Sequence, residues 1–261
     1  MANRPTTIIS RREAIHLGAD AIGDGEPLVL LPGLGRAASD VRPLADILVN
    51  HGYAVLLPEP RGIGASTGPL DAITLHDLAA DIASLIEQWI SGPATIIGHA
   101  FGNRIARTLA ADRADLVSAV VLLSSSGKVQ PTDEIAEAIR LAQAVDTPPD
   151  VRRIAVQQAW FAPGHDGTAW LDGWSQPVMK AYLAAAAATP VEEWWTAGSK
   201  PVLIVQGLCD VAAPVGNGRL LKQELGERGT LIELPDIGHA MPVEDPHACA
   251  RPILEFLRRQ R

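Results

Sequence analysis

The chain is poor in cysteine and in long apolar runs, and each absence excludes a class of protein. Only two of its 261 residues are cysteines, Cys209 and Cys249, so we expect no disulfide framework and a reducing compartment. No stretch reaches the roughly 18 apolar residues that a membrane span requires, and the first residues lack the apolar run of a signal peptide. The sequence therefore predicts a cytoplasmic protein with no membrane partner.

Positive charge is scarce as well. The formal net charge is −8, from 22 Lys and Arg against 30 Asp and Glu, and no basic stripe is available to neutralise phosphates. The seven histidines show no metal-ligand spacing, and no Gly-x-Gly-x-x-Gly motif opens a strand–helix unit. We expect no nucleic-acid partner, no metal and no cofactor.

What the chain does contain is a regular alternation of short apolar runs and amphipathic stretches. The composition, 47% hydrophobic and 20% charged, suits one large domain. Helical periodicity occupies residues 39–50 and 74–91. Buried strands are predicted at six places: 27–31, 53–57, 94–97, 118–123, 201–206 and 230–234. This order predicts an α/β fold with a mostly parallel central sheet and helices on both faces, and the segments 6–9 and 14–17 could add an antiparallel hairpin.

One region interrupts the alternation. Residues 128–198 contain no convincing strand, are rich in alanine, and hold five of the six tryptophans. We interpret them as a helical lid, or cap, inserted into an α/β core formed by residues 1–127 and 199–261. The tryptophans could simply pack this insertion onto the core. Alternatively, they form an aromatic underside that contacts an apolar substrate, and the candidates for that role are Trp160, Trp170, Trp174 and Trp194.

The pentapeptide 98–102, Gly-His-Ala-Phe-Gly, has the layout of a nucleophile elbow, the sharp strand-to-helix turn that usually carries a serine at its centre. Both glycines are present, but position 100 is alanine. The start of the following helix would offer the backbone N–H of Phe101 to a developing oxyanion, and the glycine-rich loop 31–35 could offer that of Leu34. The turn therefore has the features of a catalytic site without the hydroxyl group.

Two other loops complete the pattern. Asp210 follows the strand 201–206, and His239 follows the strand 230–234. The chain thus presents the nucleophile position, the acid and the histidine in the order Ala100, Asp210 and His239. Each follows a separate strand, and the carboxyl ends of parallel strands bring residues that are distant in sequence close together. Asp236 precedes a turn and is a weaker candidate for the acid.

Three residues close to the elbow have other expected roles. His99 should pack or form a hydrogen bond rather than act as a second base. Arg104 and Arg107 should face solvent or pair with acids on neighbouring helices.

These motifs together resemble the α/β-hydrolase fold superfamily over essentially the whole chain, through residues 32–35, 61–64, 98–102, 207–210 and 238–239. The resemblance implies a Ser–acid–His triad and a two-amide oxyanion hole beneath a variable lid. By that resemblance Asp210 is the acid, His239 is the base, and the amides of Leu34 and Phe101 form the oxyanion hole. Two features depart from the family: Ala100 stands at the nucleophile position, and Pro32-Gly33 replaces the His-Gly that often opens the oxyanion loop.

Position 100 has two explanations. A serine could have been replaced to trap a complex, or the alanine could be natural, which we favour because the chain carries no tag or linker. The resemblance predicts a hydrolase-like enzyme, of the carboxylic ester hydrolase class in the first place, that acts on a small, largely apolar ester, thioester, lactone or carbon–carbon bond.

Two alternatives stay open. The protein could be a lyase or isomerase in which His239 removes a substrate proton, or a non-catalytic protein that binds a small molecule. Retention of both Asp210 and His239 favours an enzyme, because a binding protein needs no oriented imidazole. These patterns encode neither the substrate's identity nor an oligomeric state.

Overall fold

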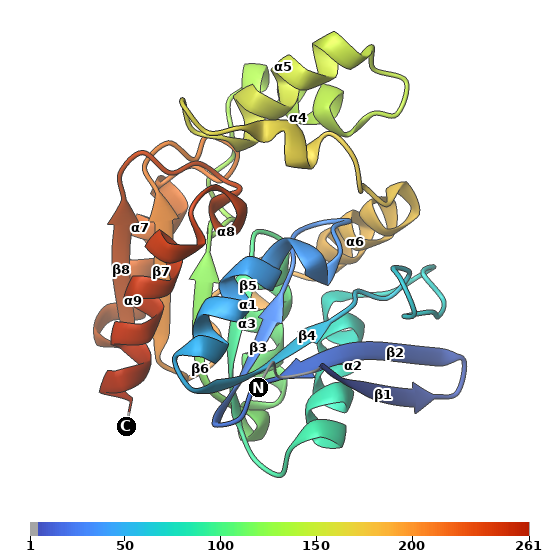
Figure 1. Ribbon diagram of the computed structural model, residues 1–261, viewed down its shortest axis with the longest axis vertical. Helices are drawn as coiled ribbons and strands as arrows, with labels where there is room; N and C mark the ends of the chain where they lie inside the picture. Colours follow the sequence, from blue (N-terminus) through green and yellow to red (C-terminus); the bar gives the residue numbers. More distant parts are fainter. Residues whose placement is uncertain (1–4, 261) are drawn as a thin grey trace.

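The computed structural model describes residues 5–260, so the first four residues considered above for a signal peptide lie outside the described range. Within that range eight strands form one sheet in the order β1-β2-β4-β3-β5-β6-β7-β8 (Figure 1). β1 and β2 form an antiparallel hairpin, β2 also runs antiparallel to β4, and the other neighbours are parallel. The strands are β1 (Thr6–Arg12), β2 (Ile15–Ile22), β3 (Glu26–Leu31), β4 (Tyr53–Pro58), β5 (Ala94–His99), β6 (Val117–Leu123), β7 (Val202–Gly207) and β8 (Gly229–Leu234).

Helices cover both faces of this sheet because successive strand residues point to opposite sides. In β3, Leu28 and Leu30 pack with α1 (Arg42–Asn50) and α9 (Pro246–Arg259). Val29 and Leu31 pack instead with the helices of the other face, α2 (Leu75–Trp89), α3 (Gly102–Asp112) and α7 (Gly216–Leu225). The predicted α/β class is confirmed.

Each predicted strand is present, and its observed ends lie within two residues of the predicted ones. The hairpin is longer than the sequence indicates. Most of β1 is exposed, so it lacks the apolar pattern by which a strand is recognised, and its pairing with β2 extends from Thr6 to Arg12.

The segment between β6 and β7 is helical and contains no strand. α4 (Asp133–Gln143), α5 (Pro149–Trp160) and the 3-10 helix η3 (Gly167–Trp170) form an apolar cluster of their own, above the carboxyl ends of the strands in Figure 1. α6 (Gln176–Ala188) differs, because Val178, Tyr182 and Ala185 belong to the main core. We use the name cap for residues 133–174, a shorter stretch than the predicted insertion 128–198.

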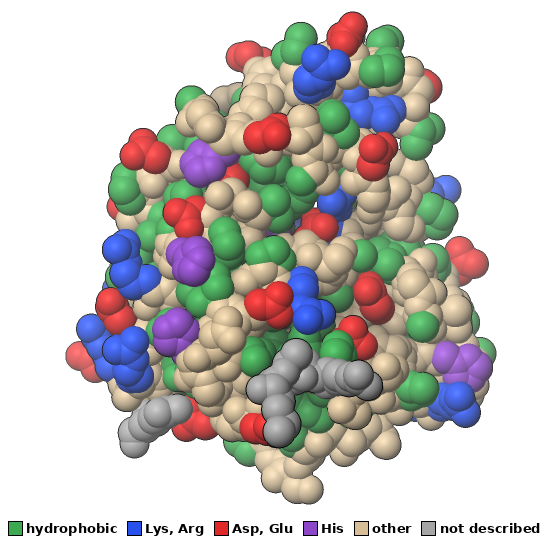
Figure 2. All heavy atoms as spheres, in the orientation of Figure 1, with side chains coloured by type: hydrophobic (Ala, Val, Ile, Leu, Met, Phe, Trp, Pro, Cys, Tyr) green, Lys and Arg blue, Asp and Glu red, His purple; other side chains and the backbone are tan. Residues whose placement is uncertain are grey.

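One face of the molecule can be assessed for its charge distribution. On the face shown in Figure 2, acidic and basic side chains are interspersed rather than gathered into separate fields. Among the helices of residues 5–260, none combines the length and the apolar character needed to cross a membrane.

The turn between β5 and α3 has no space for a side chain at either glycine. A Cβ on Gly98 would lie 2.5 Å from backbone atoms of Asn103, and one on Gly102 would lie 2.6 Å from the carbonyl oxygens of Leu31 and Pro32. Backbone atoms cannot move aside as a flexible side chain can, so both glycines are required by close approach.

We expect Gly98→Ala to lower the free energy of unfolding by about 3 kcal/mol or more, at the upper end of overpacking costs. Urea denaturation monitored by circular dichroism measures this. Gly216→Ala is the matched control, because its Cβ would make an ordinary 3.5 Å contact with Val129 at the start of α7, and its effect should stay within about 0.5 kcal/mol. Equal stabilities of the two variants would contradict the steric argument.

Candidate active site

Ala100 occupies the centre of the β5–α3 turn in a strained backbone conformation. Its φ is 49°, in the left-handed region that residues other than glycine seldom adopt. The turn is held by two hydrogen bonds: the N–H of Ala100 donates to the Leu123 carbonyl (2.9 Å), and the Ala100 carbonyl accepts from the Asn103 N–H (3.2 Å). Ala100 is 7% exposed and lies on the wall of a cavity.

His239 and Asp210 form a buried pair. The Nδ1 atom of His239 lies 3.1 Å from each carboxylate oxygen of Asp210. Asp210 is oriented by two further donors, the Ala213 N–H at 2.7 Å and the Gln206 side-chain amide at 3.4 Å. A carboxylate at Nδ1 requires the proton there, which leaves Nε2 of His239 as an acceptor. No other described residue forms a hydrogen bond with that nitrogen.

One cavity of about 220 Å³ brings the predicted residues together. Ala100 and His239 both line it, as do Leu34 and Phe101, whose backbone N–H groups donate to no other described residue. The cap contributes Ile139 and three tryptophans, Trp160, Trp170 and Trp174, to its apolar wall. The arrangement offers an unpaired imidazole nitrogen and two unpaired amide donors in one small space.

The backbone at His239 is anchored from the sheet. Its carbonyl accepts from Nε2 of His99 (2.8 Å) and from the hydroxyl of Ser124 (2.9 Å). Burial, reinforced by the nearby His239 ring, lowers the pKa of His99 to about 3, so His99 stays neutral. His99 therefore forms a structural hydrogen bond, as the sequence analysis expects.

Comparison with known proteins identifies the family of the chain. The family model for the alpha/beta hydrolase fold matches residues 26–164, more than half of the chain, and a model for TAP-like proteins matches residues 172–261. The chain belongs to the α/β-hydrolase fold family.

Relatives from this family align over nearly the full length. BpoC of Mycobacterium tuberculosis is 29% identical over 257 residues, which cover 93% of this chain and 97% of BpoC. Rhodomycin D methylesterase DnrP of Streptomyces peucetius is 25% identical, over 94% of this chain and 96% of DnrP. The structure of Rv0554 from Mycobacterium tuberculosis superposes with a TM-score of 0.81 at 27% identity, covering 97% of this chain and 99% of that chain.

Sequence reasoning missed three residues that hold this α/β-hydrolase fold site together. Gln206 contacts Asp210, and its Oε1 accepts from the Ser125 N–H (3.0 Å). Ser124 supports the His239 carbonyl. Glu244 accepts from the N–H groups of cap residue Ala162 and of Gly238, both at 3.0 Å. Gln206 and Ser124 are polar residues at the ends of apolar strands, a pattern that could have indicated a place in the site. The sequence around Glu244 contains no comparable pattern.

Three side chains lie in surroundings other than those the sequence predicts. Trp194 is not on the cavity wall; it is 3% exposed in the main core, against Trp195. The prediction for Arg107 was wrong: it is fully buried, and it donates to Asn103 and to the Ser126 carbonyl because α3 turns this face inward. The prediction for Arg104 was wrong in the same way, since it is only partly exposed, lines the cavity, and has no acidic partner among residues 5–260.

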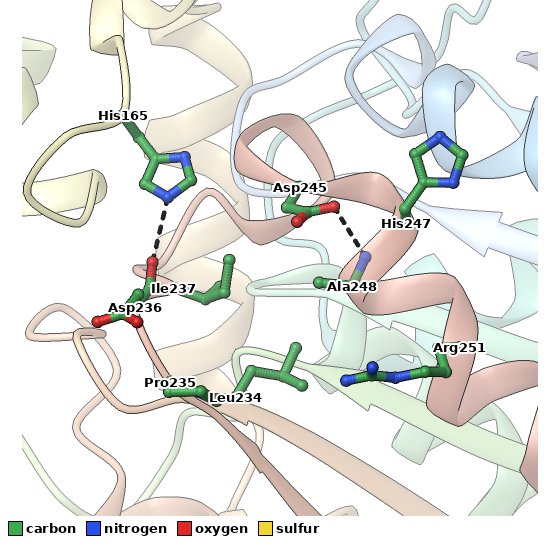
Figure 3. Close-up of a pocket in the computed structure, with 9 residues that line it drawn as sticks. All are labelled: His165, Leu234, Pro235, Asp236, Ile237, Asp245, His247, Ala248 and Arg251. Carbon is green, nitrogen blue, oxygen red and sulfur yellow. Dashed lines mark hydrogen bonds between the residues drawn. The ribbon is translucent and has the colours of Figure 1, made fainter.

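A larger hollow, of about 560 Å³, lies on the outer side of the 234–237 loop, and its side chains serve structure rather than chemistry (Figure 3). Nε2 of His165 donates to the Asp236 carbonyl, which joins the cap to this loop, and Asp245 accepts from the Ala248 N–H at the start of α9. Asp236 itself is exposed, and the carboxylate that pairs with His239 is that of Asp210. Within residues 5–260, no group of three or more His, Cys, Asp and Glu side chains is placed to hold a metal ion.

Burial of His99 predicts a pH dependence of stability. The unfolded chain binds a proton here near pH 6.5, whereas the folded chain does so only near pH 3. Unfolding therefore becomes more favourable as pH falls through this window, by up to about 1.4 kcal/mol per pH unit from this group. His99→Gln, which can still donate to the His239 carbonyl, should flatten the slope in urea denaturation between pH 6 and 4.

The control is His247→Gln, because His247 is exposed and should leave the pH slope unchanged. Parallel pH profiles for the unaltered chain and His99→Gln would show that the buried imidazole is not the source.

Proposed function

We propose that this protein is an enzyme of the carboxylic ester hydrolase type, in which alanine occupies the nucleophile position and the His239–Asp210 pair acts directly as general base. The substrate is a small, largely apolar carbonyl compound: an ester, thioester, lactone or a compound with an activated carbon–carbon bond. The observation that carries this proposal is the pairing of Nδ1 of His239 with both oxygens of Asp210 at the wall of the cavity that Ala100 lines.

The mechanism follows from what the cavity offers. A water molecule hydrogen-bonded to Nε2 of His239 gives up a proton as its oxygen attacks the substrate carbonyl. The developing oxyanion accepts from the N–H groups of Leu34 and Phe101. The imidazolium, stabilised by Asp210, then returns the proton to the leaving oxygen as the carbon–oxygen bond breaks. No acyl-enzyme forms, because position 100 has no hydroxyl.

Two further considerations support the proposal. An alanine in place of serine leaves the binding and oxyanion contributions intact, which in serine hydrolases are worth roughly 10³ to 10⁴ in rate over water. A relative aligned along almost the whole chain is named as a methylesterase. Ester hydrolysis is therefore the first reaction to assay.

The decisive experiment compares the unaltered chain with His239→Ala and Ala100→Ser on 4-nitrophenyl acetate and butyrate. The unaltered chain should release nitrophenol steadily and without a burst, and His239→Ala should lower kcat/KM by about 10² or more, the usual contribution of a general base. Ala100→Ser should add a burst of one nitrophenol per chain, because one acyl group stays on the new serine. Mass spectrometry detects that acyl group. His247→Ala, at an exposed histidine, controls for nonspecific imidazole catalysis.

Steady turnover that survives His239→Ala would refute the general-base mechanism. Activity confined to Ala100→Ser would show that the alanine disables an otherwise ordinary esterase site. If neither chain hydrolyses an ester but both bind aromatic ligands, the binding-protein alternative holds.

Asp210→Asn tests the second member of the pair. An amide at this position can donate to Nδ1, which favours the tautomer with its proton on Nε2 and removes the base, so we expect kcat to fall by about 10² to 10⁴ while KM changes little. Steady-state kinetics measure this, with Asp236→Asn as control because Asp236 is exposed and apart from the pair. An unchanged kcat in Asp210→Asn would contradict the orienting role.

A further inference from the structure

Among residues 5–260, the ionisable side chains that line the cavity are all basic. Arg36, Arg104 and His239 line the cavity, and no aspartate or glutamate is among its described lining residues. Arg36 is neutralised by Asp40, through contacts of 2.7 and 3.2 Å, and its guanidinium also donates to the Asp172 carbonyl. His239 has Asp210 as its partner. Arg104 is thus the arginine of the cavity wall that has no acidic partner among residues 5–260.

Arg104 is held in place by aromatic rings instead of a carboxylate. Its guanidinium carbon lies 5.6 Å from the ring centre of Phe101 and 5.7 Å from that of Trp194. Its Nε is buried and has no hydrogen-bond partner within residues 5–260. Burial lowers the pKa of Arg104, and Arg107, on the same helix, adds a second positive charge nearby. A partly desolvated cation with open donors costs free energy that an anion in the cavity would offset.

The position of Arg104 relates this anion to the reacting carbonyl. Arg104 lies three residues after Phe101 in the first turn of α3, a spacing that places both on one side of the helix. The Phe101 N–H is one of the two amides assigned above to the oxyanion. The cavity measures about 220 Å³, so one small molecule that spans it can place an anion at Arg104 and its carbonyl at the Leu34 and Phe101 amides.

We propose that Arg104 binds a carboxylate of the substrate, so that the substrate is a small carboxylic acid that also carries the hydrolysable carbonyl. This inference rests on the proposed function of the same cavity. A planar guanidinium matches a carboxylate in a bidentate arrangement, and the tryptophans of the cap accommodate an aryl or alkyl body. Arg104 is then a specificity-determining residue, and the preferred substrates are half-esters or keto acids rather than neutral esters.

The test measures binding and needs no turnover. Benzoate and benzamide, which share shape and differ in charge, are titrated by calorimetry at pH 7 into the unaltered chain, Arg104→Met and Arg104→Lys. Benzoate should bind the unaltered chain about tenfold or more tightly than benzamide, as expected for a charge-assisted pair. Arg104→Met should abolish the preference, Arg104→Lys should keep part of it, and Arg258→Met, at an exposed arginine of α9, should leave it unchanged.

Several outcomes would overturn the carboxylate assignment. These are no benzoate binding, equal binding of benzoate and benzamide by the unaltered chain, or an undiminished preference in Arg104→Met. Loss of benzoate binding in His239→Gln alone would assign the anion to the imidazole, and inorganic phosphate binding as tightly as benzoate would indicate a general anion site. If Arg104→Met does not fold, the comparison of benzoate with benzamide on the unaltered chain and on Arg104→Lys still tests the carboxylate assignment. Failure here leaves the His239 kinetics untouched, so the two proposals fail separately.

Discussion

The close approach of the β5–α3 turn to the loop after β3 is the constraint on which the site depends. Gly102 packs on the carbonyl oxygens of Leu31 and Pro32 with no space for a methyl group, so the turn and the loop after β3 meet in a single arrangement. Gly98 packs as closely on the backbone of Asn103, which fixes the turn itself. The left-handed conformation of Ala100 follows, because the chain must change direction within one residue between strand and helix. The same geometry leaves the N–H groups of Leu34 and Phe101 at the cavity wall without a hydrogen-bond acceptor among residues 5–260.

The loop that carries His239 is fastened to this turn from several sides. The His239 carbonyl accepts hydrogen bonds from His99 and Ser124, and the His239 ring pairs with Asp210. Glu244 accepts from the N–H of the preceding residue, Gly238, and also from a backbone N–H of the cap. An imidazole fixed by so many contacts loses little freedom when a ligand binds, and this is the preorganisation that proton transfer requires. His99 contributes to this anchoring as a neutral hydrogen-bond donor, because burial disfavours the protonated form of its imidazole.

The tryptophans of the region between β6 and β7 divide into two groups with different physical roles. Three tryptophans of the cap form an apolar wall for the cavity. Trp194 and Trp195 instead pack in the core against Arg107. Their ring centres lie 4.6 and 4.9 Å from its guanidinium carbon. Ring faces partly replace the hydration of a cation, which makes a buried arginine tolerable without a carboxylate. Arg104 lies at the border of this group, where the core meets the cavity.

The amino-acid sequence by itself determined the α/β class, the strand positions, and the order of Ala100, Asp210 and His239, because apolar periodicity and strand-end loops are local patterns. Only the tertiary structure decided that Trp194 lies in the core while other tryptophans line the cavity, and that Arg104 meets a ligand space instead of an acid. The physical reason is that periodicity reports whether a side chain is buried. What it is buried against depends on residues brought close by the fold from far along the chain.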